Sequence, residues 1–403
     1  MITFDKALAR MLAAARPLGL EQVPFGETIG RVLAEDVRAD TDMPPFAKSA
    51  MDGFACRRAD LPGPLRVVEE IPAGRMPQHA IGPGEAARIM TGAPVPQGAD
   101  CVLMIEDTVE ETDGRVRFTG ERTADNLCLR GEDVRQGEVV LPAGSLLGTA
   151  HLAVLAAVGK IEVAVARRPR VGIIATGSEL VEPDDTPQGA MIRNSNSPQL
   201  LTQAALAGAA VKYYGIVADD PGATRAAIAR ARDENDVVVL SGGVSAGDFD
   251  YVPAALADCG YRIVFDSVAM QPGRPTVFGE LADGVGWCVG LPGNPVSTYV
   301  IFELMLHPFL LGLQGHAWRP REVEAVLDED VRRRNVKRQA AMPVRFSKPG
   351  RVRLIEYHGS GHIAAMTVAE GLVFLPVGCA ELKAGERVRV RVFSDARTGG
   401  YSP

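Results

Sequence analysis

The feature that most constrains the fold is a regular alternation of strands and helices between residues 169 and 317. Four runs rich in aliphatic and β-branched residues are each followed by a segment with helical spacing. This order is typical of βαβ units, which build a mostly parallel sheet covered by helices. We therefore expect a three-layer α/β domain over 169–317. Its expected strands span 171–176, 211–217, 237–240 and 287–290.

Capping residues predict where the helices of this domain begin. Ser197, with Pro198 in the first turn, favours one helix start, and Asp220 before Pro221 favours a second. A third helix is expected to start near Asp250, and a long last helix to run through Leu306.

The remainder of the chain has a different texture. An amphipathic helix opens residues 1–38, whereas 39–137 are dense in Pro and Gly with short β-like runs. We expect an Ala/Leu-rich helix at 149–157 to pack on the N-terminal helix. Residues 1–38 and 138–168 would then form one discontinuous linking and dimerisation domain, into which the β-rich domain 39–137 is inserted. The period-two alternation in 318–403 predicts a C-terminal β-barrel.

Composition and charge exclude several classes of protein. The 43 basic and 50 acidic residues leave a net charge of −7, which argues against nucleic acid as a partner. The six cysteines form no C-x-x-C pair, so neither structural zinc nor a disulfide scaffold is expected. The most apolar stretch, 299–313, is interrupted by Glu303, His307 and Pro308 and is shorter than the ~20 residues of a membrane span. We expect a cytoplasmic protein with no membrane partner.

Polar or glycine-rich loops follow all four expected strands, at the edge where open α/β sheets bind ligands. Ser241, Gly242 and Gly243 could bring backbone N–H groups to an anion, although by themselves they fit a plain tight turn better. Carboxylates in these loops could supply oxygen ligands to Mg²⁺, which also binds substrate phosphates. The loops together predict phosphoryl or pyrophosphate chemistry, but without a P-loop or a dinucleotide fingerprint.

Further candidates lie outside this domain. Asp52, Thr91 and Asp133 occupy short loops rich in small residues, where local turn chemistry is the simpler interpretation of each. The basic run 332–338 is typical of a solvated edge or linker. Arginine also suits a flat bidentate contact with an oxyanion, so one residue of this run could face a tetrahedral anion.

The ordered set of loops closely resembles the molybdopterin molybdenumtransferases, the MoeA family that includes the gephyrin E domain. The resemblance covers essentially the whole chain. The motifs that carry it are Ser49-Ala-Met-Asp52-Gly-Phe54, Thr91-Gly-Ala-Pro-Val-Pro-Gln-Gly-Ala-Asp100, Gly131-Glu-Asp133, Thr176-Gly-Ser-Glu179-Leu180, Ser241-Gly-Gly-Val-Ser245-Ala-Gly-Asp248-Phe-Asp250-Tyr251 and Leu291-Pro-Gly-Asn-Pro295-Val-Ser297.

This resemblance implies the last step of molybdenum cofactor synthesis. Members of the family hydrolyse adenylyl-molybdopterin in a divalent-metal-dependent reaction, insert molybdate into its dithiolene and release AMP. They are elongated homodimers whose active site lies between the α/β domain of one subunit and elements of the other. Further implied partners are molybdopterin adenylyltransferase and apo-molybdoenzymes.

Site residues are carried over by motif. The implied catalytic positions are Asp52, Thr91, Asp133, Glu179, Asp219 and Asp250, of which Glu179, Asp219 and Asp250 would hold Mg²⁺. The implied substrate-binding positions are Ser241, Gly242, Gly243, Ser245, Gln271, Arg274, Pro292, Gly293, Asn294, Pro295, Arg338 and Ser360.

One segment departs from the family pattern. Many members have Lys-Pro-Gly-Lys-Pro where this chain has Gln271-Pro-Gly-Arg274-Pro275, and an earlier family lysine falls at Ser267 or Asp266. Gln271 can donate hydrogen bonds to molybdate but brings no charge. We expect either weaker molybdate binding or compensation by Arg274 and Arg338.

Two other functions remain open at this stage. A molybdopterin adenylylation enzyme would use the same α/β scaffold but would need neither the inserted nor the C-terminal domain. A scaffold protein would not need the set of acidic residues. The preference between molybdate and tungstate, and the molybdoenzyme served, are left open.

Overall fold

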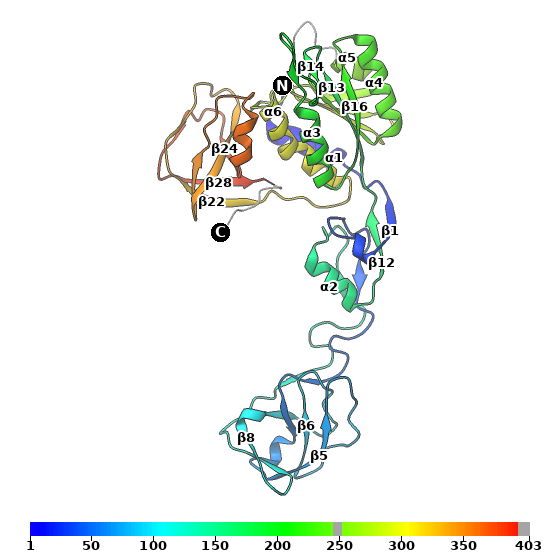
Figure 1. Cartoon of the computed structure of the whole chain (residues 1–403), viewed down its shortest axis with the longest axis vertical. Coiled ribbons are helices and arrows are strands. Elements are labelled where there is room, and N and C mark those ends of the chain that lie inside the picture. The colour runs from blue at the N-terminus through cyan, green and yellow to red at the C-terminus, as the bar shows by residue number, and fades with distance from the viewer. Residues whose placement is uncertain (245–251, 394–403) are drawn as a thin grey trace. The chain divides into compact units, whose positions relative to one another are not determined.

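The computed structural model describes residues 1–244 and 252–393 and divides into two compact units (Figure 1). The first comprises Met1–Gln22, Gly30–Ala34 and the chain from Ala164 onward, and the second comprises Val23–Ile29 and Glu35–Val163. The predicted positions Ser245 and Asp250 lie outside the described residues, as does the expected helix start at Asp250.

The first unit contains a six-stranded sheet in the order β16-β13-β17-β21-β20-β18. Its four parallel strands match the four expected from the sequence, and two antiparallel strands at one edge were not expected. The parallel strands are β13 (Arg170–Thr176), β16 (Ala210–Val217), β17 (Val237–Ser241) and β21 (Trp287–Leu291), and the antiparallel strands are β18 (Tyr261–Phe265) and β20 (Val277–Leu281).

Helices cover both faces of this sheet because its strands bury side chains on both sides. Ile173 and Val239 face a core shared with α1, α3, α6 and α7, whereas Ile174 and Val238 face α4 and α5. The three-layer α/β domain is therefore confirmed. The helices are α3 (Asn196–Leu206), α4 (Pro221–Glu234), α5 (Val252–Asp258), α6 (Pro295–Ile301) and α7 (His307–Gly312), with a π-helical segment, Phe302–Leu306, joining the last two.

Of the two capping residues expected from the sequence, one is confirmed and one is wrong. Asp220 caps α4 as predicted, since its carboxylate accepts a hydrogen bond from the Ala223 N–H (2.7 Å). The Ser197 cap is wrong. Helix α3 begins at Asn196, and it is Asn194 whose side-chain oxygen accepts from the Ser197 N–H (3.1 Å). Ser195 precedes the helix but makes no side-chain cap bond, so the hydrogen bond from Asn194 satisfies a backbone N–H of the first turn instead.

The continuous helix Pro295–Gly312 is long and apolar enough to cross a membrane, but 78% of it is buried inside the protein. It is a core helix of the α/β domain, and its polar residues do not interrupt it.

Helix α1 (Phe4–Ala14) packs within the α/β domain, so its expected packing against α2 (Thr149–Ala157) is wrong. Phe4, Ala7 and Met11 are buried in the same core as α7. The amphipathic pattern shows that one face of α1 must be buried, but not against which element. The division of the chain into four domains stays a prediction.

The C-terminal part of the first unit is a closed five-stranded barrel, as the sequence predicted. Its strands follow the order β24-β25-β22-β28-β26, and β24–β26 pairing closes it. The strands are β22 (Glu322–Leu327), β24 (Gln339–Lys348), β25 (Arg351–Leu354), β26 (Gly371–Leu375) and β28 (Arg387–Val392). One further strand, β19 (Met270–Gln271), leaves the α/β domain and pairs in parallel with β24.

The second unit contains a curled sheet in the order β7-β4-β6-β5-β9-β8. Its strands are β4 (Gly53–Cys56), β5 (Leu65–Ile71), β6 (Glu85–Ile89), β7 (Cys101–Met104), β8 (Thr108–Glu110) and β9 (Arg115–Phe118). Short two-stranded pairs occur in other parts of the chain as well. Residues 180–193 and 331–382 of the first unit contain β14 (Leu180–Val181) with β15 (Ile192–Arg193) and β23 (Val331–Arg332) with β27 (Glu381–Leu382). The other pairs are β1 (Leu20–Pro24) with β12 (Glu162–Ala166), β2 (Val37–Arg38) with β11 (Val139–Leu141) and β3 (Lys48–Ser49) with β10 (Leu127–Cys128).

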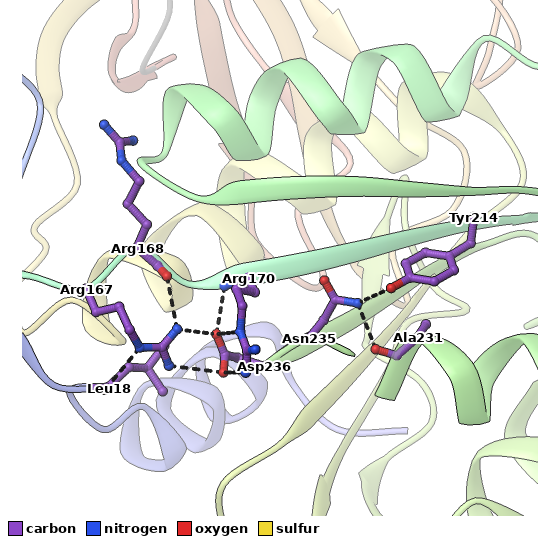
Figure 2. A network of polar contacts seen from close by, with 8 residues as sticks. All are labelled: Leu18, Arg167, Arg168, Arg170, Tyr214, Ala231, Asn235 and Asp236. Carbon is purple, nitrogen blue, oxygen red and sulfur yellow. Dashed lines mark hydrogen bonds and ion pairs between the residues drawn. The ribbon is translucent and has the colours of Figure 1, made fainter. Parts of the chain in front are cut away.

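An ion cluster around the buried carboxylate of Asp236 holds the amino ends of β13 and β17 together (Figure 2). The Asp236 carboxylate accepts hydrogen bonds from the Arg167 guanidinium (2.9 and 3.1 Å) and from the Arg170 backbone N–H (2.7 Å). Burial alone would raise the pKa of Asp236, but the bonds from Arg167 and Arg170 outweigh it and hold that pKa below its usual value. The opposite, carboxyl ends of these strands are free to build a site.

Candidate active site

A cavity of 670 Å³ lies at the carboxyl ends of the parallel strands, where the sequence placed the polar loops. Loops from all four strands line it. The predicted site residues among them are Glu179, Asp219, Ser241, Gly242, Gly243, Pro292, Gly293, Asn294 and Pro295.

The two acids come from neighbouring loops, which are tied together by reciprocal hydrogen bonds. The Ser178 N–H donates to Asp219 Oδ2 (3.0 Å), and the Asp219 N–H donates to Ser178 Oγ (2.9 Å). The Glu179 carboxylate lies against Gly177, where a Cβ atom would come within 2.6 Å of Oε2. Among the described residues, no three acidic, histidine or cysteine side chains are grouped closely enough to hold a metal ion by themselves.

Close backbone approach explains the glycine at position 242. Its φ of +97° disfavours any side chain, and a Cβ atom there would lie 2.9 Å from Thr176 Oγ1 and closer still to the Thr176 backbone oxygen. The turn after β17 therefore folds back onto the end of β13, and it presents Ser241 and Gly243 at the cavity wall.

A second cavity, of 720 Å³, brings together Gln271, Arg274, Arg338 and Ser360. The β19–β24 pairing places Gln271 opposite Ala340, and Arg338 just before β24 donates to the Met270 backbone oxygen (3.3 Å). The Ser360 loop of the barrel is fixed on the α/β domain, because the Val296 N–H donates to the Ser360 backbone oxygen (3.0 Å).

Charges of both signs line this second cavity. Arg274 and Arg338 bring two cations, and Asp266 brings one carboxylate that accepts from the Ser267 hydroxyl (2.9 Å). Burial raises the pKa of Tyr357, so this phenol in the cavity wall stays protonated and able to donate. The two cavities adjoin, since Val244 and Pro275 line both.

The remaining candidates lie in the second unit. Asp52 accepts hydrogen bonds from both the hydroxyl and the N–H of Thr91 (2.6 Å each), and these bonds hold the pKa of this exposed carboxyl below its usual value. Asp133 is exposed, and its N–H donates to the Met43 backbone oxygen (3.0 Å). The structure thus pairs two of the three candidates directly.

Comparison with known proteins decides the family. Models of the MoeA N-terminal region (domain I and II), of a probable molybdopterin binding domain and of the MoeA C-terminal region (domain IV) match residues 2–159, 172–312 and 324–393. The chain belongs to the MoeA family.

Two curated relatives of this MoeA-family chain are named molybdopterin molybdenumtransferase. The protein from Staphylococcus epidermidis is 36% identical over 400 residues, covering 96% of this chain and 95% of the relative. The protein from Bacillus subtilis is 34% identical over 408 residues, covering 96% and 93%.

Solved structures agree with the family assignment. A molybdopterin biosynthesis moeA protein from Pyrococcus horikoshii aligns with a TM-score of 0.85 at 29% identity, covering 98% of this chain and all of that one. A second structure of a moeA protein from this source gives 0.80 at 31% identity, with 98% and 99% coverage. The expected fold is confirmed, and so is the expected class of enzyme, a transferase of molybdenum cofactor biosynthesis.

Several cavity residues of this MoeA-family protein were not expected from the sequence, and three of them have polar side chains that bear on the site. Asn196 lines the first cavity, and Ser297 and Tyr357 line the second. Ser297 ends the family motif Leu291–Ser297, but it was not named as a site residue. Asn196 looks like a helix cap in the sequence, and Tyr357 lies in a stretch with no motif, so only the tertiary structure reveals them.

Proposed function

We propose that the chain inserts molybdate into adenylyl-molybdopterin, hydrolysing the pyrophosphate link and releasing AMP. The observation that carries this proposal is the adjoining pair of cavities. One has a glycine turn and two carboxylates suited to phosphates, and the other has two arginines suited to an oxyanion. A substrate that contains a pyrophosphate and reacts with molybdate needs both.

In the first cavity, Ser241, Gly242 and Gly243 would bind phosphate oxygens, and the loop Pro292–Pro295 would form the opposite wall. Glu179 and Asp219 are suited to hold Mg²⁺, because this ion takes one or two carboxylates and completes its shell with water and substrate phosphates. Asp250 is our third proposed ligand. Bound Mg²⁺ would neutralise charge that develops on the pyrophosphate.

In the second cavity, Arg274, Arg338, Gln271 and Ser360 would bind molybdate. Arginine presents planar, fixed donors, so Arg274 and Arg338 would orient the molybdate while adenylyl-molybdopterin is bound in the adjoining first cavity. The buried Ser297 hydroxyl is a further donor in this wall.

We also propose that the protein acts as a homodimer in the cytoplasm. Helix α2 is rich in Ala, Leu and Val, yet it buries only Leu155, and Phe25, Leu146 and Ile161 of the same unit are exposed. These exposed apolar side chains support an interface in this unit. Asp52, Thr91 and Asp133 would then serve the active site of the second copy. Molybdopterin adenylyltransferase would supply the substrate, and apo-molybdoenzymes would receive the product.

Release of AMP tests the proposal. Purified protein is incubated with adenylyl-molybdopterin, Mg²⁺ and molybdate, and AMP is measured over time. We expect AMP and molybdenum-loaded cofactor in equal amounts, and loss of both in Glu179→Gln. The matched control is Asp233→Asn, on the exposed side of α4. Binding of the nucleotide without any AMP release would refute the proposal.

A further inference from the structure

The side chain of Asn196 connects two walls of the first cavity. Its Nδ2 lies 2.7 Å from Ser241 Oγ, at the end of β17, and 2.8 Å from the Gly293 backbone oxygen, in the loop after β21. A backbone oxygen can only accept a hydrogen bond, so the atom that faces Gly293 must be the amide nitrogen. The contact with Gly293 therefore fixes the orientation of the amide.

This orientation determines what the Ser241 hydroxyl can do. Nδ2 has two protons, and because one goes to Gly293, the other goes to Ser241 Oγ, which must accept it. The hydroxyl then keeps its own proton for a different acceptor. Ser241 is only 3% exposed and lines the cavity beside Gly242, and within the described part of the chain its hydroxyl has no acceptor.

A second observation indicates that this position requires the two N–H donors of the Asn196 side chain. The residue is 8% exposed, and its Oδ1 is buried without a hydrogen-bond partner among the described residues. A buried acceptor without a partner costs stability. An apolar side chain would avoid that cost if packing were the only requirement at this position.

We infer that Asn196 is a positioning residue that makes Ser241 a directed hydrogen-bond donor to a phosphate oxygen of the substrate. The inference deepens the proposed function and rests on it. Asn196 touches no substrate atom in this scheme. Its Nδ2 donates a hydrogen bond to a lone pair of Ser241 Oγ, so that the O–H bond points into the cavity before the anion binds.

A double-mutant cycle with inorganic pyrophosphate as the probe tests this inference. The affinity of wild type, Asn196→Ala, Ser241→Ala and the double variant is measured by calorimetry at constant salt. A hydrogen bond to an anion affects affinity by roughly tenfold or more, so we expect each single variant to bind about tenfold more weakly. Since both remove the same bond to pyrophosphate, the double variant should lose about tenfold in total, whereas two independent contacts would lose about a hundredfold.

The control is Asn235→Ala, in the same domain at the other end of the sheet. Asn235 also donates two hydrogen bonds, to the Tyr214 hydroxyl (2.6 Å) and the Ala231 backbone oxygen (2.8 Å), and it lines no part of the cavity (Figure 2). The Asn235→Ala substitution should lower the melting temperature but leave the affinity for pyrophosphate unchanged. If Asn196→Ala does not fold, Asn196→Leu takes its place in the cycle, because leucine has the same branched shape as asparagine, carries no charge and removes both donors.

The possible outcomes separate this inference from the proposed function. Additive losses, or an Asn196 variant that binds as wild type does, would overturn the inference even if AMP release is normal. Wild type that binds no pyrophosphate would overturn it as well. Coupled losses in a protein that releases no AMP would support the role of Asn196 and refute the transferase proposal.

Discussion

Replacing Gln271 with lysine tests how the second cavity binds an oxyanion. Gln271 is exposed and lines this cavity, as do Arg274, Arg338 and Asp266. The side chain can reach into the cavity, but it adds no charge to the two cations. The Gln271→Lys substitution therefore raises the local net charge from +1 to +2, counting Asp266 as −1.

The size of the effect follows from Coulomb's law. Two unit charges ~4 Å apart attract by about 1 kcal/mol in water and by about 4 kcal/mol at the lower effective dielectric near a protein surface. The exposure of position 271 favours the lower value. The double charge of molybdate increases the attraction, while salt at 0.15 M reduces it. We expect a gain of about 1–1.5 kcal/mol, or roughly five- to tenfold tighter binding.

Calorimetric titration of molybdate into wild type and Gln271→Lys, at two salt concentrations, measures this gain. The control is Gln78→Lys, which adds the same charge to an exposed site in the second unit. We expect tighter binding for the first variant alone, with a stronger salt dependence. An unchanged molybdate affinity would show that Arg274 and Arg338 already saturate the site, and our reasoning on local charge would be refuted.

Four shorter predictions concern other parts of the molecule. Asp219→Asn should bind adenylyl-molybdopterin normally but release AMP more than tenfold more slowly, in a single-turnover assay. Gly242→Ala should lower the free energy of unfolding by about 2–4 kcal/mol in urea titrations, because the new Cβ meets Thr176 and φ is positive. The lowered pKa of Asp236 stabilises the fold fully above the ordinary pKa of 3.8, and this contribution declines as pH falls from 3.8 through the lowered pKa of the folded state, so Asp236→Asn should destabilise the protein more in urea at pH 7 than at pH 3. Ala156→Glu, on the exposed side of α2, should yield monomers in sedimentation experiments.

The sequence predicted the α/β sheet well because burial on both faces leaves a clear signature. All five residues of β17 are buried, and a short, nearly continuous apolar run is typical of a central strand covered on both sides. The antiparallel strands β18 and β20 were missed, since their partial burial follows no regular period and a glycine stands inside β20. The position of α1 was wrong because an apolar face does not specify its partner.

The candidate site divides in a similar way. Residues carried by a motif, such as Glu179 and Ser241, line the first cavity as the loop positions suggested. Asn196 was missed because its importance depends on two contacts with residues 45 and 97 positions away in the chain. No local pattern encodes contacts of that kind.

The position of the barrel separates the two enzymatic functions that the sequence left open. An adenylylation enzyme needs only an α/β domain, yet here the barrel helps to build the second cavity. Arg338 and Ser360 come from the barrel region, and Gln271 extends from the α/β domain into the barrel sheet. Neither part alone contains both the phosphate-type cavity and the complete set of oxyanion donors. The paired cavities therefore favour a reaction in which a second, anionic substrate meets a phosphorylated one, and this favours molybdate insertion over adenylylation.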